Sequence, residues 1–140
     1  MITEISLEKF LEAQARDYHN AFAEIKTGRK RSHWMWYIFP QIDGLGFSSM
    51  SKRYAIRDLK EAAAYLAHPV LGRRLIDISN ALLDIPGYDA TAVMGSPDDL
   101  KLRSSMTLFA LVPGANQVFE AVLHKYFHGQ KDKATLELVT

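Results

Sequence analysis

The stretch from Ser96 to Val112 reads Ser-Pro-Asp-Asp-Leu-Lys-Leu-Arg-Ser-Ser-Met-Thr-Leu-Phe-Ala-Leu-Val. It begins as a helix should, with Ser96 as a cap, Pro97 at the first helical position and two acids in the first turn, where the helix dipole favours them. Apolar side chains then fall on every side of a helical wheel, and a helix that is apolar all round is a buried one. We therefore expect residues 97–112 to form the central helix. Its apolar residues are Leu100, Leu102, Met106, Leu108, Phe109, Leu111 and Val112.

Three hydroxyl residues, Ser104, Ser105 and Thr107, lie within this helix. A buried hydroxyl without a hydrogen-bond partner costs roughly 1–3 kcal/mol, so each of them needs one. One solution is the carbonyl four residues back in the same helix. The other is a polar pocket, which makes Ser104 and Ser105 candidate ligand-binding residues.

The rest of the chain indicates helices that pack around this centre. An apolar stripe runs from Leu7 to Ile25, with Ser6 as its cap and Gly28 at its end, and charged residues including Glu24 fill the opposite face. The pattern predicts one compact all-α domain over residues 1–140, with about seven helices around 97–112. The other expected helical segments are a short one between Ser32 and Pro40, 51–56, 59–67 capped by Asp58 and ended by His68-Pro69, 71–85, a turn from Asp89 to Gly95, 118–128 and 133–139.

The composition is that of an ordinary globular protein, with 140 residues, 48% hydrophobic, 24% charged and no cysteine. Zero cysteines exclude Cys-ligated zinc, thiol catalysis and disulfides. The longest apolar run, Trp34 to Phe39, is far too short to cross a bilayer. The first residues show no secretory signal, so we expect a cytoplasmic protein with no membrane partner.

The formal net charge of +1 hides an uneven distribution. Residues 26–60 carry eight basic and two acidic side chains, or +6, so the remainder carries −5. A segregated positive segment indicates an anionic partner or substrate, although a solvated basic face beside acidic helices gives the same pattern. The near-neutral total argues against nucleic acid as the partner without excluding it.

The segment from residue 29 to residue 41 combines three consecutive basic residues with a cluster of aromatic rings. Aromatic faces stack on bases and cations hold phosphate, so this composition suits a nucleotide. The alternative is that both tryptophans are core anchors, since large aromatics supply much of a small core. The ligand-binding candidates here are Arg29, Lys30, Trp34, Trp36 and Gln41.

Gly44, Gly46 and Ser48 belong to a loop that precedes a helix start. Backbone N–H groups exposed in such a loop can bind phosphate, which makes these three residues ligand-binding candidates. Glycine in an ordinary turn is the alternative explanation.

Asp98 and Asp99, beside Lys101, can supply acid–base chemistry or contact a ribose hydroxyl. Capping and the helix dipole explain both acids equally well. Together with His33 they are the expected catalytic residues, and Lys101 joins the ligand-binding candidates.

The histidines do not indicate a metal site. Only His124 and His128 have helical i, i+4 spacing, and no nearby acid completes three protein ligands. The sequence also lacks phosphate-loop, dinucleotide-binding, zinc-protease and nucleophile-elbow motifs. We therefore expect no metal and no cofactor.

Five motifs spread along the chain are distinctive. They are Phe10-x-x-Ala13-Gln14; Gly28-x-Lys30-x-x-His33-Trp34-Met35-Trp36-x-x-Phe39-Pro40-Gln41 with Gly44-Leu45-Gly46; Tyr65-Leu66-x-His68-Pro69-x-Leu71-Gly72-x-Arg74-Leu75; Asp98-Asp99-x-Lys101-x-x-Ser104-x-x-Thr107-Leu108-Phe109; and Gly129-x-x-Asp132-x-x-Thr135-Leu136. Together they resemble a bacterial family of unknown function, number eighteen-ten of the uncharacterised-domain series. The resemblance implies a mainly helical single-domain fold and supplies no established activity.

Members of that family are sometimes labelled calpastatin. The periodic apolar pattern of this chain contradicts the label, because that inhibitor is a long, disordered, polar chain with repeats. The expected fold is also similar to that of small helical proteins that process NAD-derived and ADP-ribose compounds. This is an analogy of fold alone.

We therefore expect a helical protein that binds or hydrolyses a phosphate-bearing small molecule, such as a nucleotide or ADP-ribose derivative. If the protein is an enzyme, we expect hydrolysis at a glycosidic carbon, assisted by a carboxylate, among the reactions that need neither metal nor thiol. The alternative is a non-enzymatic module that offers residues 26–60 to an acidic protein or RNA. A homodimer formed through apolar faces is a third interpretation, and the sequence leaves the oligomeric state open.

Overall fold

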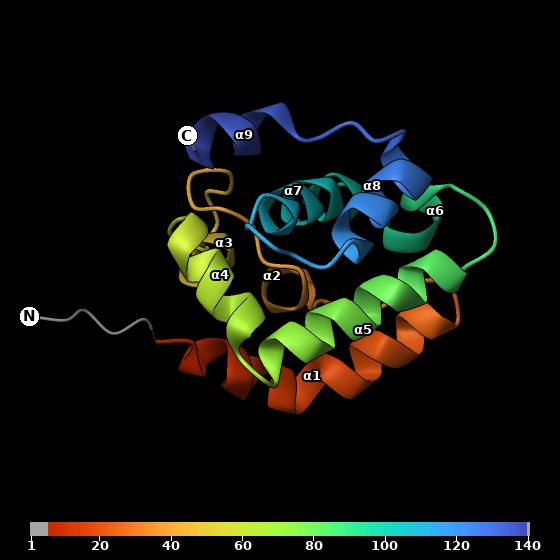
Figure 1. Ribbon diagram of the computed structural model, residues 1–140. Coiled ribbons are helices and arrows are strands. Elements are labelled where there is room, and N and C mark those ends of the chain that lie inside the picture. The colour runs from red at the N-terminus through yellow and green to blue at the C-terminus, as the bar shows by residue number, and fades with distance from the viewer. Residues whose placement is uncertain (1–5, 140) are drawn as a thin grey trace, which may run out of the picture.

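The computed structural model describes residues 6–139, which form nine α-helices and no strand (Figure 1). This confirms the expected all-α fold in one compact domain. The helices outnumber the expected seven because α2, α3 and α6 are single turns of four or five residues. The helices are α1 (Glu8–Lys26), α2 (Met35–Ile38), α3 (Ser49–Arg53), α4 (Leu59–Ala67), α5 (Leu71–Asp84), α6 (Ala90–Met94), α7 (Asp98–Ala110), α8 (Val118–Phe127) and α9 (Lys133–Val139).

α7 lies at the centre of the molecule, as its apolar pattern predicts. Figure 1 shows it in the middle of the view, and α4, α6, α8 and α9 all pack against it. Met106, Leu108 and Phe109 are fully buried. The first turn differs from the expectation, because Leu100 is 57% exposed where the helix emerges at the surface.

Aromatic side chains join the helices across this core. The Phe10 ring of α1 meets the Tyr65 ring of α4 edge-on, with centroids 5.2 Å apart. Tyr65 continues to Phe109 of α7 at 5.3 Å, and Phe109 continues to Phe119 of α8 at 5.9 Å. These contacts link four helices that are far apart in the sequence.

Several predicted helix ends are confirmed. The Asp58 carboxylate accepts a hydrogen bond from the Glu61 N–H at 2.8 Å, and Asp89 accepts one from the Ala92 N–H at 3.1 Å. At the end of α1, Gly28 has φ +90°, and the N–H groups of Gly28 and Arg29 bond back to the carbonyls of Ile25 and Glu24. This pair of bonds is a Schellman motif.

Three predicted serine caps are wrong. No capping side chain precedes α1, α2 or α7, whose N-cap positions hold Leu7, Trp34 and Pro97 instead of Ser6, Ser32 and Ser96. At α7 the Gly95 carbonyl accepts from the Asp99 N–H at 2.9 Å, so the backbone itself supplies the partner. The expected 51–56 helix is also shifted, because Ser48 caps α3 and starts it at Ser49.

The buried face of α1 is rotated from the predicted stripe. Ala15, expected inside, is exposed, whereas Gln14 and Glu24 are buried. Gln14 compensates by donating from Nε2 to the Tyr37 carbonyl and to the Tyr65 hydroxyl, both at 2.8 Å. Polar side chains with buried partners thus replace apolar ones on this face.

Glu24, predicted on the charged outer face, is the most heavily bonded of these side chains. Its Oε1 accepts from the backbone N–H groups of Arg31 and Ser32 at 2.7 and 2.9 Å and from the Trp34 indole at 2.9 Å. Its Oε2 accepts from the Ser32 hydroxyl at 2.6 Å and from the Asn20 amide at 2.9 Å. The carboxylate thereby fixes the connection between α1 and α2.

These bonds change the acidity of Glu24. Burial opposes ionisation of the carboxyl, but the hydrogen bonds from Ser32, Arg31 and Trp34 favour the charged form more strongly. They lower the pKa of Glu24 from 4.5 to about 2. The resulting stability is present above the ordinary pKa and is lost as the pH falls through the folded-state value.

We expect the Glu24→Gln variant to lose roughly 3 kcal/mol of unfolding free energy at pH 7, since a neutral amide cannot replace an acceptor of five hydrogen bonds. The difference from wild type should fall to about half at pH 3, where the unfolded-state carboxyl is protonated. Urea unfolding at the two pH values measures both numbers.

Glu12→Gln is the matched control, because Glu12 is exposed on the same helix. It should change the unfolding free energy by less than about 0.5 kcal/mol. An equal pH dependence in wild type and Glu24→Gln would contradict the assigned role of this carboxylate.

Candidate functional site

A pocket of about 220 Å³ opens beside the start of α7. Three segments form it: the loop between α2 and α3, the first turns of α7, and the residues that lead into α9. Figure 1 shows that loop and α9 on the same side of α7. The lining residues are Gln41, Leu45, Gly46, Ser51, Pro97, Leu100, Lys101, Ser104, Asp132 and Ala134.

Four ligand-binding candidates from the sequence meet in this pocket. Gln41 and Gly46 come from the loop, and Lys101 and Ser104 come from α7. These two pairs are more than fifty residues apart in the chain. The fold therefore brings together groups that the sequence only suggested separately.

The loop glycines are required by close packing. A Cβ at Gly46 would lie 2.4 Å from the Ser51 Cβ, a separation that real side chains do not tolerate. Gly44 has φ +103°, and a Cβ there would lie 3.2 Å from the Leu138 side chain of α9. Ser48 accepts a hydrogen bond from the Ser51 N–H at 3.1 Å, so it caps α3. This loop thus forms the pocket wall through its shape.

Lys101 is the cation of the pocket. Its ammonium lies 3.6 Å from Asp98 Oδ1 and 5.6 Å from the centroid of the partly exposed Trp36 ring. The other oxygen of Asp98 pairs with Lys30 at 2.9 Å. Lys30 in turn lies 4.9 Å from the Trp34 ring centroid and donates to the Ser32 carbonyl. One carboxylate is therefore shared by two ammonium groups.

Two of the candidate residues belong to the core. Trp34 is 1% exposed, and its indole N–H is used by Glu24, so its ring is not available to stack on a ligand. Trp34 is therefore a core anchor, which was the alternative to ligand stacking. Ser105 is fully buried, and its hydroxyl is without a hydrogen-bond partner among residues 6–139. Neither side chain lines the pocket.

The predicted catalytic residues are not assembled into one centre. Both Asp99 oxygens are engaged, by the Thr91 hydroxyl at 2.6 Å and by the Leu100 N–H at 2.9 Å, and the residue lines a neighbouring surface depression beside Tyr88. His33 and Arg29 have exposed side chains outside the pocket lining. Asp98 is engaged by its two lysines.

Asp132 is the pocket residue that sequence reasoning missed. Its Oδ2 accepts from the Ser104 hydroxyl at 3.0 Å and from the Thr135 N–H at 3.1 Å, and also from the Thr135 hydroxyl. The Ser104 hydroxyl also lies 3.1 Å from the carbonyl oxygen of Leu100, four residues back in the same helix. It therefore has both kinds of partner expected from the sequence, a helix carbonyl and a polar group in a pocket. An acid three residues before a threonine at a helix start was the available signal.

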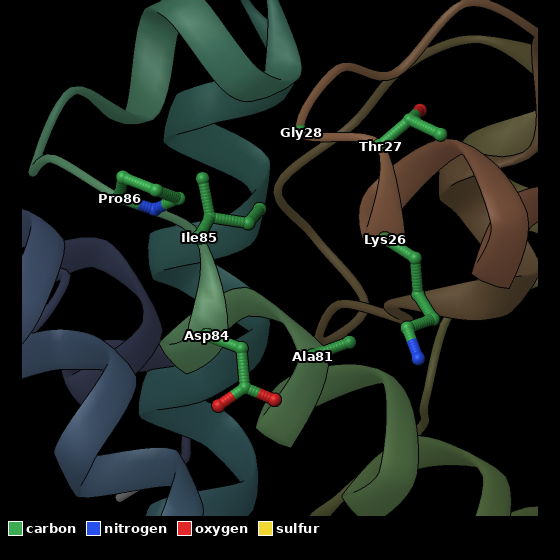
Figure 2. Close-up of a pocket in the computed structure, with 7 residues that line it drawn as sticks. All are labelled: Lys26, Thr27, Gly28, Ala81, Asp84, Ile85 and Pro86. Atoms are coloured by element: carbon green, nitrogen blue, oxygen red, sulfur yellow. The ribbon is translucent and has the colours of Figure 1, made fainter.

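A second, smaller pocket lies between the ends of α1 and α5 (Figure 2). Its volume is about 110 Å³, and none of the predicted site residues lines it. Figure 2 shows Lys26 of α1 and Asp84 of α5 on opposite walls. Within residues 6–139, no group of three potential metal-ligating side chains occurs, and no helix is long and apolar enough to span a membrane.

The fold and the pocket beside α7 define a small all-α protein with a mixed-charge cleft beside its central helix. The chain belongs to the family described as "Protein of unknown function (DUF1810)", which matches residues 4–139. This confirms the resemblance drawn from the sequence motifs.

The structure is also similar to the crystal structure of the conserved hypothetical protein Rv1873 from Mycobacterium tuberculosis. The two chains are 47% identical, the TM-score is 0.93, and the match covers 95% of each chain. No curated protein matches the chain. The comparisons therefore support the fold and the family and leave the activity to be argued from the pocket.

We expect Gly46→Ala to cost roughly 1–3 kcal/mol, because the added methyl group overlaps the Ser51 Cβ and forces the loop away from α3. Removing that atom in the double variant Gly46→Ala/Ser51→Gly should recover part of the loss. Urea unfolding of both single variants and the double variant measures the coupling. Strictly additive effects would show that this contact does not constrain the loop.

Proposed function

We propose that this protein binds a phosphate-bearing small molecule, of the nucleotide class, in the pocket beside α7. The observation that carries the proposal is the convergence of Gln41, Gly46, Lys101 and Ser104 on one cleft. Lysine serves as a point-charge phosphate ligand, and hydroxyl and amide groups add hydrogen bonds to phosphate oxygens. Trp36 lies against the same lysine and can stack on an attached ring.

The pocket favours binding over hydrolysis by the carboxylates first considered. The two oxygens of Asp98 face Lys30 and Lys101, and those of Asp99 are occupied by Thr91 and Leu100. A general acid or base needs a proton position within reach of the substrate.

The volume of the pocket, about 220 Å³, is smaller than that of a typical site for a drug-sized ligand, so part of a bound nucleotide would extend beyond it.

Calorimetry and tryptophan fluorescence with inorganic phosphate, AMP, ADP-ribose and NAD test this proposal. We expect saturable binding, with a fluorescence change because Trp36 lies 5.6 Å from the Lys101 ammonium. Lys101→Met should weaken binding by about tenfold or more through loss of a charge-assisted contact. Lys60→Met is the control, since Lys60 is exposed on α4 outside the pocket.

Equal affinity in wild type and Lys101→Met would show that the ligand binds elsewhere. The absence of heat and fluorescence change at millimolar concentrations of all four compounds would reject the proposal.

A second candidate function is a non-enzymatic module for an acidic protein or RNA. Lys52 and Lys60 are exposed and form no ion pair with any residue the structure describes, which favours an external anionic partner. Binding of this kind weakens steeply with salt. We expect a Lys52→Met/Lys60→Met variant to reduce the affinity for an RNA oligonucleotide and its salt dependence, whereas phosphate binding in the pocket stays unchanged.

A further inference from the structure

Asp132 is fixed in place before any ligand arrives. Its backbone N–H donates to the Thr107 hydroxyl oxygen at 2.9 Å, and that hydroxyl donates to the Arg103 carbonyl at 2.8 Å. The Arg103 guanidinium bonds to the carbonyls of Gln130 and Lys131 at 3.0 and 2.9 Å. The three residues that end at Asp132 are thus attached to α7, so little ordering is needed on binding.

The two oxygens of the Asp132 carboxylate have different environments. The bonds from Ser104 and Thr135 all end on Oδ2. No residue within 6–139 donates a hydrogen bond to Oδ1. An ionised carboxylate only accepts, and each of its oxygens has two lone pairs. Asp132, which lines the pocket, therefore has an acceptor oxygen with free capacity.

The polar groups of the pocket are complementary to a ligand with two different ends. Lys101 offers a positive donor, and Asp132 offers a negative acceptor. Because an ammonium group on the ligand would be repelled by Lys101, which lines the same pocket, a neutral hydroxyl is the better donor to Asp132.

We propose that the pocket takes a phosphorylated polyol of about pentose size, with its phosphate at Lys101 and a hydroxyl donating to Asp132 Oδ1. This inference rests on the proposed function and names the chemical class of the ligand. The pocket volume of about 220 Å³ accommodates such a molecule, and Leu45, Pro97 and Ala134 give apolar contact to its carbon chain.

Calorimetry on the whole protein with four phosphates of different attached groups tests the inference. The probes are inorganic phosphate, glycerol 3-phosphate, ribose 5-phosphate and phosphoethanolamine. Wild type should bind ribose 5-phosphate about tenfold more tightly than inorganic phosphate, which is the gain expected of one hydrogen bond to a charged group. Phosphoethanolamine should bind more weakly than glycerol 3-phosphate, since its ammonium group is repelled by the ammonium group of Lys101.

Asp132→Asn is the matched variant. Its amide oxygen can still accept from Ser104 and Thr135, while an NH₂ group replaces the free acceptor. We expect its affinity for ribose 5-phosphate to fall to within about threefold of its affinity for inorganic phosphate. Circular dichroism checks that the variant folds, and the wild-type series decides the matter if it does not.

The outcomes separate the two proposals. If inorganic phosphate and ribose 5-phosphate bind equally well, or if phosphoethanolamine binds best, phosphate binding stands and the polyol assignment is overturned. An unchanged ribose 5-phosphate affinity in folded Asp132→Asn overturns it as well. If none of the probes binds, the proposed function fails and the polyol assignment fails with it.

Discussion

The carboxylate of Glu24 fixes the turn between α1 and α2 through five hydrogen bonds, and much of the molecule depends on that turn. It anchors the Trp34 indole in the core and sets the direction in which the chain leaves α1. A buried charge is tolerated only when hydrogen bonds replace its lost hydration, and here backbone, hydroxyl, amide and indole donors all contribute. Loss of the charge therefore exposes the turn, and the core beneath it, to rearrangement.

The same turn leads to the pocket through Lys30. This lysine follows the end of α1, lies over the anchored Trp34 ring and pairs with Asp98, which also pairs with Lys101. The position of the pocket cation is thus connected, contact by contact, to the buried carboxylate of α1. Trp34, which at first suggested ligand stacking, contributes by supporting this chain of contacts from within the core.

The spacing of apolar residues and the capping residues predicted the fold well, because both depend only on residues near in the sequence. Examples are the apolar residues of 97–112 and the caps Asp58 and Asp89. Side-chain partners distant in the sequence escaped prediction. Glu24 follows Ala21 by three residues on the buried face, yet only its bonds to 31–34 explain why a charge lies there. Likewise Gln41, Gly46, Lys101 and Ser104 were suggested by composition, whereas Asp132 becomes visible only when α9 is folded against α7. The motif that begins at Asp98 and the motif that begins at Gly129 meet at that bond between Ser104 and Asp132.

Thr135 is the only buried residue of α9, and polar contacts of Asp132 and Thr135 attach the start of this helix to α7. Segments that bury little apolar surface open at lower free energy than the core, so this end of the chain is expected to unfold locally while α7 remains intact. Asp132 is attached to α7, but its carboxylate caps the start of α9, so occupancy of the pocket and order of that helix are thermodynamically linked. A ligand that bridges Lys101 and Asp132 holds the Asp132 carboxylate in its capping position, and part of its binding energy appears as slower amide hydrogen exchange in α9.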